Sequence, residues 1–366
     1  MNRIAIARTS GIATVLMIAL AACGSGGAEE TSTAQIAAST TATPVTGPTL
    51  VESMAAEPGE PESTATEPSA IEPVETELPT TDPATAIGPR MIEHQYGTTE
   101  VPADPERIVA LSEEFLLADL LALGITPVAS SSNSADGFGG IDPALTASIE
   151  ITTTATFNIE QVAAFRPDLI LAYPIYIELV GYDTLNAVAP TVAIGDDDSD
   201  WRERLQLTAK VLGVDKLGAE SIDEFQAQHD AAREVLDGVR MSAVSIFDRS
   251  FIRAYTDGGT FLTRVMADAG VEFVPAAADI DGVDGVGRVQ LSLEQLGRMQ
   301  GDMLLLLQRP GLEDAGVADV ADSPVWPTLP AVQDDAVITL DRLGYPGAAG
   351  AAAFAADLAA AVAALR

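Results

Sequence analysis

The chain of 366 residues contains 54 acidic and only 19 basic side chains, which gives a formal net charge of −35 at neutral pH. A chain of this charge repels the phosphates of nucleic acids, so the composition argues against a nucleic-acid partner. The single cysteine, Cys23, excludes internal disulfides.

The first 22 residues have the pattern of a lipoprotein signal peptide. Arg3 and Arg8 precede an apolar run over residues 11–20, which is too short to span a bilayer as a mature helix. The sequence Leu-Ala-Ala-Cys at 20–23 resembles a lipobox, so we expect Cys23 to carry diacylglycerol and palmitate. An incidental thiol within an ordinary signal peptide is the alternative. The prediction is an extracytoplasmic protein anchored by lipid to the outer face of the cytoplasmic membrane.

Residues 23–90 are rich in Thr, Pro, Ala and Glu and show no apolar periodicity. Such a segment cannot bury enough apolar surface to offset its chain entropy, which predicts a disordered stalk. Its eleven acids and the single Arg90 make it self-repelling and extended. The stalk would hold a folded body away from the membrane.

An α/β fold is predicted for residues 91–215, the N-terminal lobe. The segment 106–111, which is apolar from Ile108 on, is predicted to be a buried strand. It is followed by Ser112, which we expect to cap a helix with Glu113 and Glu114 in its first turn, ending at Gly124. A second strand at 127–129 completes a parallel crossover unit. Further buried strands are predicted at 169–172, 191–194, 244–247, 303–307 and 337–340.

One long helix is predicted to bridge two lobes at residues 216–238. The segment 217–237 contains no proline and places apolar residues at helical spacing over about 30 Å. The C-terminal lobe then covers residues 239–366. Its last helix carries an apolar stripe from Phe354 to Leu365, and we expect this helix to pack on the second lobe.

A fourteen-residue pattern occurs twice, at 158–171 and at 292–305. Each copy places a Glu eight residues before an Asp that opens an apolar run, and these acids are Glu160 and Glu294. The repeat predicts a helix, a turn and a buried strand in each of two similar lobes. We interpret the paired acids as a docking device; a favourable interaction with the helix dipole is the alternative.

Ligands of open α/β sheets gather beyond the carboxyl ends of the strands. In the first lobe those positions hold Ser112 and Glu113, the 130–134 loop with Phe138, Asp196, and the candidate wall residues Tyr173 and Tyr176; in the second they hold Arg249, Arg309 and Arg342. Arg288, after the Gly-rich loop 281–287, could approach from there, and Trp326 is a further candidate. Packing is the alternative for the two tyrosines and Trp326, and surface ion pairing is the alternative for Arg309 and Arg342.

Seven segments follow one another in a specific order, at 96–102, 105–109, 120–128, 158–161, 166–171, 291–296 and 326–332. In this order they resemble the iron-siderophore substrate-binding lipoproteins of ABC importers. The resemblance implies a class III periplasmic binding protein of the helical-backbone metal-receptor type, with two Rossmann-like lobes and the ligand between them. It also implies that Glu160 and Glu294 dock on a dimeric permease with its cytoplasmic ATPase, and that the segment 247–255 supplies cleft residues, Arg249 before Arg253, with Tyr255.

The expected ligand is a ferric siderophore bound by a monomer, with no resident cofactor and no catalytic residue. Haem or cobalamin is an alternative ligand, and a lipid-anchored sensor or adhesion module of the same fold is an alternative role. Bare zinc or manganese would require convergent imidazoles, whereas the chain has only His94 and His229. No nucleophile elbow, phosphate loop or dinucleotide fingerprint points to an enzyme.

Overall fold

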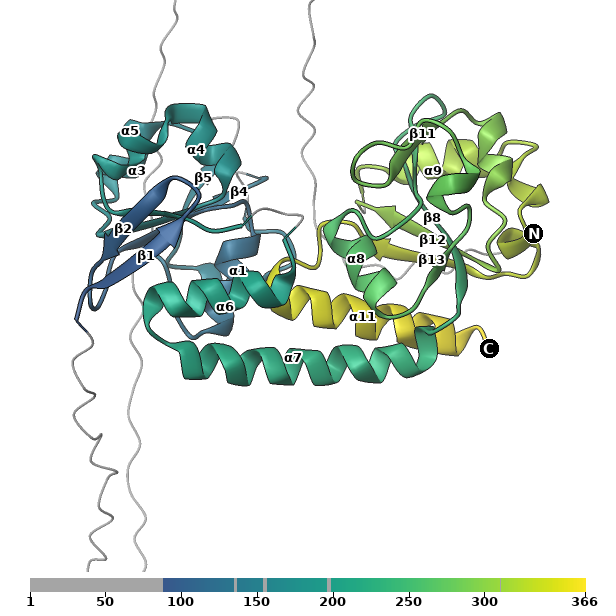
Figure 1. Cartoon of the computed structure of the whole chain (residues 1–366). Coiled ribbons are helices and arrows are strands. Elements are labelled where there is room, and N and C mark those ends of the chain that lie inside the picture. The colour runs from purple at the N-terminus through teal and green to yellow at the C-terminus, as the bar shows by residue number, and fades with distance from the viewer. Residues whose placement is uncertain (1–87, 135–136, 154–156, 196–198, 310) are drawn as a thin grey trace, which may run out of the picture. The chain divides into compact units, whose positions relative to one another are not determined.

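The computed structural model describes residues 88–366, apart from 135–136, 154–156, 196–198 and 310. The predicted signal peptide, Cys23 and the stalk up to residue 87 lie outside the described residues, as does Asp196. The hairpin of β1 (Arg90–His94) and β2 (Gly97–Val101) opens the described chain. It packs beside the first of two separate larger sheets (Figure 1).

The sheet of the N-terminal lobe contains five parallel strands in the order β5-β4-β3-β6-β7. Their bounds are β3 Ile108–Leu111, β4 Ala129–Ser132, β5 Glu150–Thr153, β6 Leu169–Ala172 and β7 Thr191–Ala193. Every residue of β3 and β6 is buried, as expected for strands covered by helices on both faces. The helices of this lobe are α1 Phe115–Ala122, α2 Pro143–Thr146, α3 Ile159–Ala164, α4 Pro174–Val180, α5 Tyr182–Asn186 and α6 Trp201–Leu212.

The sheet of the C-terminal lobe is mixed, with β12, β13 and the short β10 parallel to β8, whereas β9 and β11 form an antiparallel extension. The strands are β8 Arg240–Ile246, β9 Ile252–Tyr255, β10 Glu272–Phe273, β11 Arg288–Leu291, β12 Met303–Gln308 and β13 Val337–Asp341. The other elements of the lobe are α8 Phe261–Asp268, η2 Ala277–Asp279, η3 Glu294–Arg298, α9 Asp314–Ala321, η4 Trp326–Thr328 and α10 Pro330–Gln333. The predicted run at 244–247 is the end of β8, and β9 and β11 were not anticipated.

A 22-residue helix, α7 (Asp215–Leu236), connects the two lobes. At 1.5 Å per residue it is about 33 Å long. The two lobes joined by one long helix confirm the predicted fold class (Figure 1).

The C-terminal helix α11 (Gly347–Ala364) does not pack on the second lobe alone, contrary to expectation. It lies alongside α7 and contacts α1 and α6 of the first lobe as well as α8 of the second (Figure 1). Its many alanines allow this close approach on several sides, and 56% of its residues are buried. Although its length and hydropathy would suit a membrane span, α11 is therefore a core helix that braces both lobes.

Candidate functional site

A cavity of ≈ 210 Å³ opens where the two lobes face each other. The first lobe contributes Glu113, Glu114, Phe115 and Asn133 to its wall. The second lobe contributes Arg253, Tyr255, Thr260, Phe261, Leu262, Arg288, Leu307, Arg342, Leu343, Tyr345 and Pro346. The cavity thus combines acids and an amide on one wall with guanidinium groups and aromatic rings on the other.

The acidic wall is formed by the turn after β3. This segment was predicted to be the start of a helix. The Ser131 hydroxyl of β4 accepts hydrogen bonds from the backbone N–H groups of Ser112 and Glu113, both at 2.8 Å. Glu113 adopts φ = 57°, a left-handed conformation that is uncommon for a residue other than glycine. Helix α1 therefore begins at Phe115 and ends at Ala122, so the expectation that Glu113 and Glu114 lie in its first turn is wrong. The Ser112 hydroxyl nevertheless accepts from the backbone N–H of Leu116, the second residue of α1, at 2.7 Å, as expected of a capping side chain.

Two adjacent carboxylates of this turn have different surroundings. Glu114 is buried, and its carboxylate accepts from the Ser132 hydroxyl at 2.8 Å and from the backbone N–H and side-chain amide of Asn133, both at 3.1 Å. Glu113 is half-buried and receives one side-chain hydrogen bond, from the Asn133 amide at 2.9 Å. Burial raises the pKa of Glu113, the nearby Glu114 charge adds to this effect, and the Asn133 hydrogen bond opposes it.

The basic wall depends on antiparallel pairing between β9 and β11. Arg288 lies opposite Tyr255, and Gln290 lies opposite Arg253. This pairing brings together residues more than 30 positions apart in the sequence. Arg342, which follows β13, completes the wall.

The three guanidinium groups of this wall differ in their contacts. Arg288 pairs with Asp284 at 3.0 Å and Arg342 with Glu313 at 2.7 Å. The Arg253 guanidinium carbon lies 5.4 and 5.2 Å from the ring centres of Phe247 and Phe251, which is cation–π geometry. In the described part of the chain no carboxylate lies within ion-pair distance of Arg253.

Four of the nine ligand-binding candidates from the sequence line the cavity, namely Arg253, Tyr255, Arg288 and Arg342. The structure does not bring the other five there. Tyr173 and Tyr176 are buried in the core at the start of α4, and Trp326 is buried in η4. Arg249 pairs with Asp319 at 3.1 Å on the surface. The backbone N–H of Arg309 donates to Glu313.

The sequence reasoning missed Phe115, Phe261 and Tyr345 of the cavity wall. Phe115 and Phe261, from opposite lobes, meet edge to face with ring centres 5.0 Å apart. Phe261 is the first residue of α8, and a capping box between Thr260 and Thr263 fixes the start of that helix. The Thr260 and Thr263 spacing is a local signal that could have located this helix start, whereas the contact with Phe115 depends on how the lobes face each other.

A buried ion pair lies behind these two rings. Arg204 of α6 donates to Asp119 of α1 at 2.7 Å, and both side chains are 0% exposed. The Arg204 guanidinium carbon lies 5.4 Å from the Phe115 ring centre and 5.5 Å from that of Phe261. The second carboxylate oxygen of Asp119 accepts from the backbone N–H of Ala348 in α11 at 2.8 Å. This pair therefore connects α1 and α6 of the first lobe to α11, and Phe261 of the second lobe packs against its guanidinium group.

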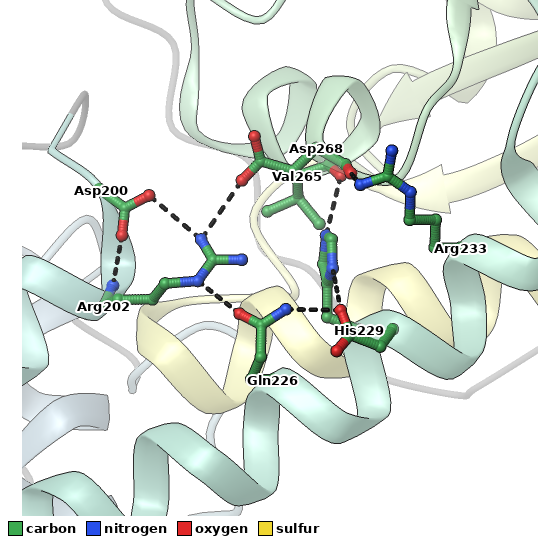
Figure 2. Close-up of polar contacts among 8 residues, drawn as sticks. Asp200, Arg202, Gln226, His229, Arg233, Val265 and Asp268 are labelled. Carbon is green, nitrogen blue, oxygen red and sulfur yellow. Dashed lines mark hydrogen bonds and ion pairs between the residues drawn. The ribbon is translucent and has the colours of Figure 1, made fainter.

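A second polar cluster joins the lobes along α7 (Figure 2). Arg202 of α6 contacts Asp200 at 3.1 Å and Asp268 of α8 at 3.3 Å. His229 of α7 lies 3.3 Å from the Val265 carbonyl of α8, and Arg233 of α7 donates to the Asp268 carbonyl. His229 thus has a structural contact, as does His94, whose ring lies 2.9 Å from the Thr99 hydroxyl.

The internal repeat corresponds to equivalent structure in both lobes. In the first copy the backbone N–H of Asp168 donates to the Arg107 carbonyl before β3, and in the second that of Asp302 donates to the Arg240 carbonyl of β8. Glu160 lies in the first turn of α3 and Glu294 in the first turn of η3, and both are exposed. A backbone hydrogen bond and the Ser292 hydroxyl lower the pKa of Glu294, which keeps this acid charged.

Comparisons with known proteins place the chain among binding proteins. It is 25% identical over 262 residues to YhfQ of Bacillus subtilis (69% of this chain, 80% of YhfQ), which is named as an ABC transporter substrate-binding lipoprotein. It is also 32% identical over 157 residues to FepB of Escherichia coli, a ferric enterobactin-binding periplasmic protein (40% of this chain, 49% of FepB).

The fold itself matches known structures. SirA of Staphylococcus aureus, crystallised with staphyloferrin B, superposes with a TM-score of 0.61 at 23% identity (74% of this chain, 96% of SirA). Residues 108–342 match the family described as periplasmic binding protein. The chain therefore belongs to the periplasmic binding protein family.

Proposed function

We propose that this protein is the extracytoplasmic substrate-binding component of an ABC importer, which binds a ferric siderophore between its lobes and delivers it to a membrane permease. The observation that supports this most directly is the interlobe cavity, where Arg253 and the aromatic side chains face the acidic turn of the first lobe. FepB is named as a ferric enterobactin-binding protein, and SirA was crystallised with staphyloferrin B. In this role the iron chelate is cargo, and the chain carries out no catalysis.

The cavity volume of ≈ 210 Å³ is below the roughly 300–1,000 Å³ of typical small-molecule sites. A ferric chelate therefore extends from the cavity toward solvent, or the lobes separate slightly to admit it. Arg253 is the guanidinium most available to the chelate oxygens, because Arg288 and Arg342 already pair with Asp284 and Glu313.

Binding of ferric catecholates, hydroxamates and carboxylates by the purified chain tests the proposal. We expect at least one iron complex to bind by isothermal titration calorimetry, with the metal-free chelator binding more weakly. Arg253→Ala should weaken binding, whereas Arg249→Ala should have no effect, because Arg249 pairs with Asp319 outside the cavity. If no ferric chelate binds, the proposed ligand class is wrong.

Delivery to the permease is proposed to depend on Glu160 and Glu294. Both acids are exposed at equivalent positions of the two lobes, where they can meet cationic pockets on a dimeric partner. Glu160→Arg or Glu294→Arg should abolish uptake of radioactive iron by cells while chelate affinity stays unchanged. Glu234→Arg, the same charge reversal at an exposed position of α7, is the control and should retain uptake. Loss of chelate binding in either docking variant would exclude this role.

The proposed anchor is a lipid on Cys23, and the proposed working state is a monomer. Both follow from the sequence pattern of residues 1–23 and from the two-lobed architecture, in which one chain supplies both walls of the cavity.

A further inference from the structure

The charges around the cavity do not form a simple anion site. Three guanidinium groups lie on its basic wall, and two of them are already paired with Asp284 and Glu313. The opposite wall adds the carboxylates of Glu113 and Glu114. Three positive groups are therefore matched by four negative ones. A highly charged anion entering this cavity would meet two facing carboxylates and one guanidinium, that of Arg253, which forms no ion pair with any residue that the structure describes.

Glu113 differs from its neighbour in a way that points to a ligand. Glu114 is buried and satisfied by Ser132 and Asn133, so its role is to hold the turn. Glu113 lines the same cavity, and among the described residues its carboxylate has a single hydrogen-bond donor, the Asn133 amide. A carboxylate oxygen accepts more than one hydrogen bond, so Glu113 retains acceptor capacity toward the cavity.

The backbone holds Glu113 in this position against its conformational preference. Its φ of 57° is maintained by the Ser131 hydroxyl, which accepts from the N–H groups of Glu113 and of the preceding residue. Sparsely populated backbone conformations of this kind persist where surrounding contacts determine them, and they cluster at ligand sites. Burial also raises the pKa of Glu113, which means that the charged carboxylate is destabilised in the absence of ligand. A cationic ligand group beside it would offset this destabilisation.

We propose that the ligand is a ferric chelate without net negative charge that carries an ammonium group, with the ammonium bound by Glu113 and the metal-binding oxygens facing Arg253. This inference rests on the proposed function and specifies its ligand class. A ferric trihydroxamate fits, because three hydroxamate anions neutralise Fe³⁺ and a free terminal amine adds one positive charge. A ferric tris-catecholate carries three negative charges and would face Glu113 and Glu114 with the wrong sign.

Calorimetric titration of the folded protein with three iron complexes tests the inference. They are a linear ferric trihydroxamate with a free terminal amine, the same complex with the amine acetylated, and a ferric tris-catecholate. We expect the amine complex to bind at least tenfold more tightly than its acetylated form, and the tris-catecholate to bind most weakly. In Glu113→Gln the ratio between the two hydroxamate complexes should fall toward one, because the amide cannot attract the ammonium electrostatically.

Two further variants separate ligand contacts from structural effects. Arg253→Gln should weaken both hydroxamate complexes by a similar factor and leave their ratio intact. Glu113→Gln should keep the circular dichroism spectrum and cooperative melting of the parent, which establishes that it folds. The inference is overturned if acetylation leaves affinity unchanged or if the tris-catecholate binds most tightly, and the proposed function survives both results. If no iron complex binds at all, the proposed function itself fails.

Discussion

Replacing Asp119 with asparagine tests the buried ion pair that joins α1 and α6 of the first lobe and contacts α11. The Asp119–Arg204 pair is 0% exposed on both sides and spans 2.7 Å. Asparagine has nearly the same shape, so it leaves no cavity, and its carbonyl oxygen can still accept from the N–H of Ala348. The change therefore removes one charge and turns an amide donor toward the Nε–H of Arg204.

The expected loss is large because the guanidinium of Arg204 stays buried. Removing one partner of a buried ion pair costs about 3–5 kcal/mol, since the other charge loses its compensation. The aromatic rings of Phe115 and Phe261, 5.4 and 5.5 Å from the guanidinium, offset this loss only in part. Total stabilities of about 5–15 kcal/mol are usual, so Asp119→Asn should remove a substantial share of the free energy of unfolding.

Urea unfolding followed by circular dichroism and tryptophan fluorescence measures this loss. Trp201 reports on α6 and Trp326 on η4, so the two lobes are observed separately when one tryptophan is replaced by phenylalanine. Glu220→Gln is the control, because the exposed Lys216–Glu220 pair contributes less than about 1 kcal/mol. The double variant Asp119→Leu with Arg204→Met should recover much of the loss. A loss in Asp119→Asn no larger than in Glu220→Gln would refute the reasoning.

Two further predictions concern single positions. Gly347→Ala should lower the free energy of unfolding in urea by about 1–3 kcal/mol more than Gly124→Ala does. Both glycines have φ near 70°, but only at Gly347 would a new Cβ lie 2.6 Å from the Cβ of Ala118. Equal losses in the two variants would contradict this. Burial raises the folded-state pKa of Glu113, so its stabilising contribution is present below the unfolded-state pKa of about 4.3 and is lost as pH rises through the folded pKa. Glu113→Gln should therefore gain stability relative to the parent between pH 4 and pH 7, and a gain that instead grew on acidification would contradict the sign.

Local patterns were enough to predict most of the parallel strands of both sheets, although β5 was not anticipated. The buried runs that became β3, β6 and β12 are short and apolar, and the repeat located Asp168 and Asp302 at equivalent strand starts. These features depend on neighbours in the sequence and on burial on both faces, which the composition of each run reports directly.

The predictions that failed concern features that depend on residues distant in the sequence. The Ser112 hydroxyl does accept the N–H of Leu116 in α1, but Ser131 from the next strand accepts from the backbone N–H groups of Ser112 and Glu113, and α1 begins only at Phe115. No local signal reveals this competition. Similarly, α11 contacts the first lobe because of how the lobes are arranged, although its stripe of apolar residues is compatible with packing on either lobe.

The cavity residues show the same limit at the level of single side chains. Arg249 and Arg253 lie four positions apart, and either could have faced the ligand. Asp248 accepts hydrogen bonds from Ser250 and Phe251 and thereby fixes a turn between β8 and β9. Arg249 lies in this turn and pairs with Asp319, whereas Arg253 lies on β9 and lines the cavity. Strand pairing determines which of the two arginines lines the cavity, and this pairing could not be predicted from the sequence alone.

The contacts between the lobes differ in strength, and this difference determines how the cavity can open. Along α7 and α11 the lobes share helix packing, and the Asp119 carboxylate, which pairs with Arg204 inside the first lobe, accepts from the backbone N–H of Ala348 in α11. The Phe115–Phe261 ring contact in the cavity wall is worth about 0.5–1.5 kcal/mol, and the half-exposed Arg202–Asp268 pair between α6 and α8 is worth less than about 1 kcal/mol. A ligand can therefore displace these two weaker contacts while the helical backbone stays intact. We expect a small opening rather than a wide hinge swing, and a change in radius of gyration of more than about 2 Å on chelate binding, measured by small-angle scattering, would exclude it.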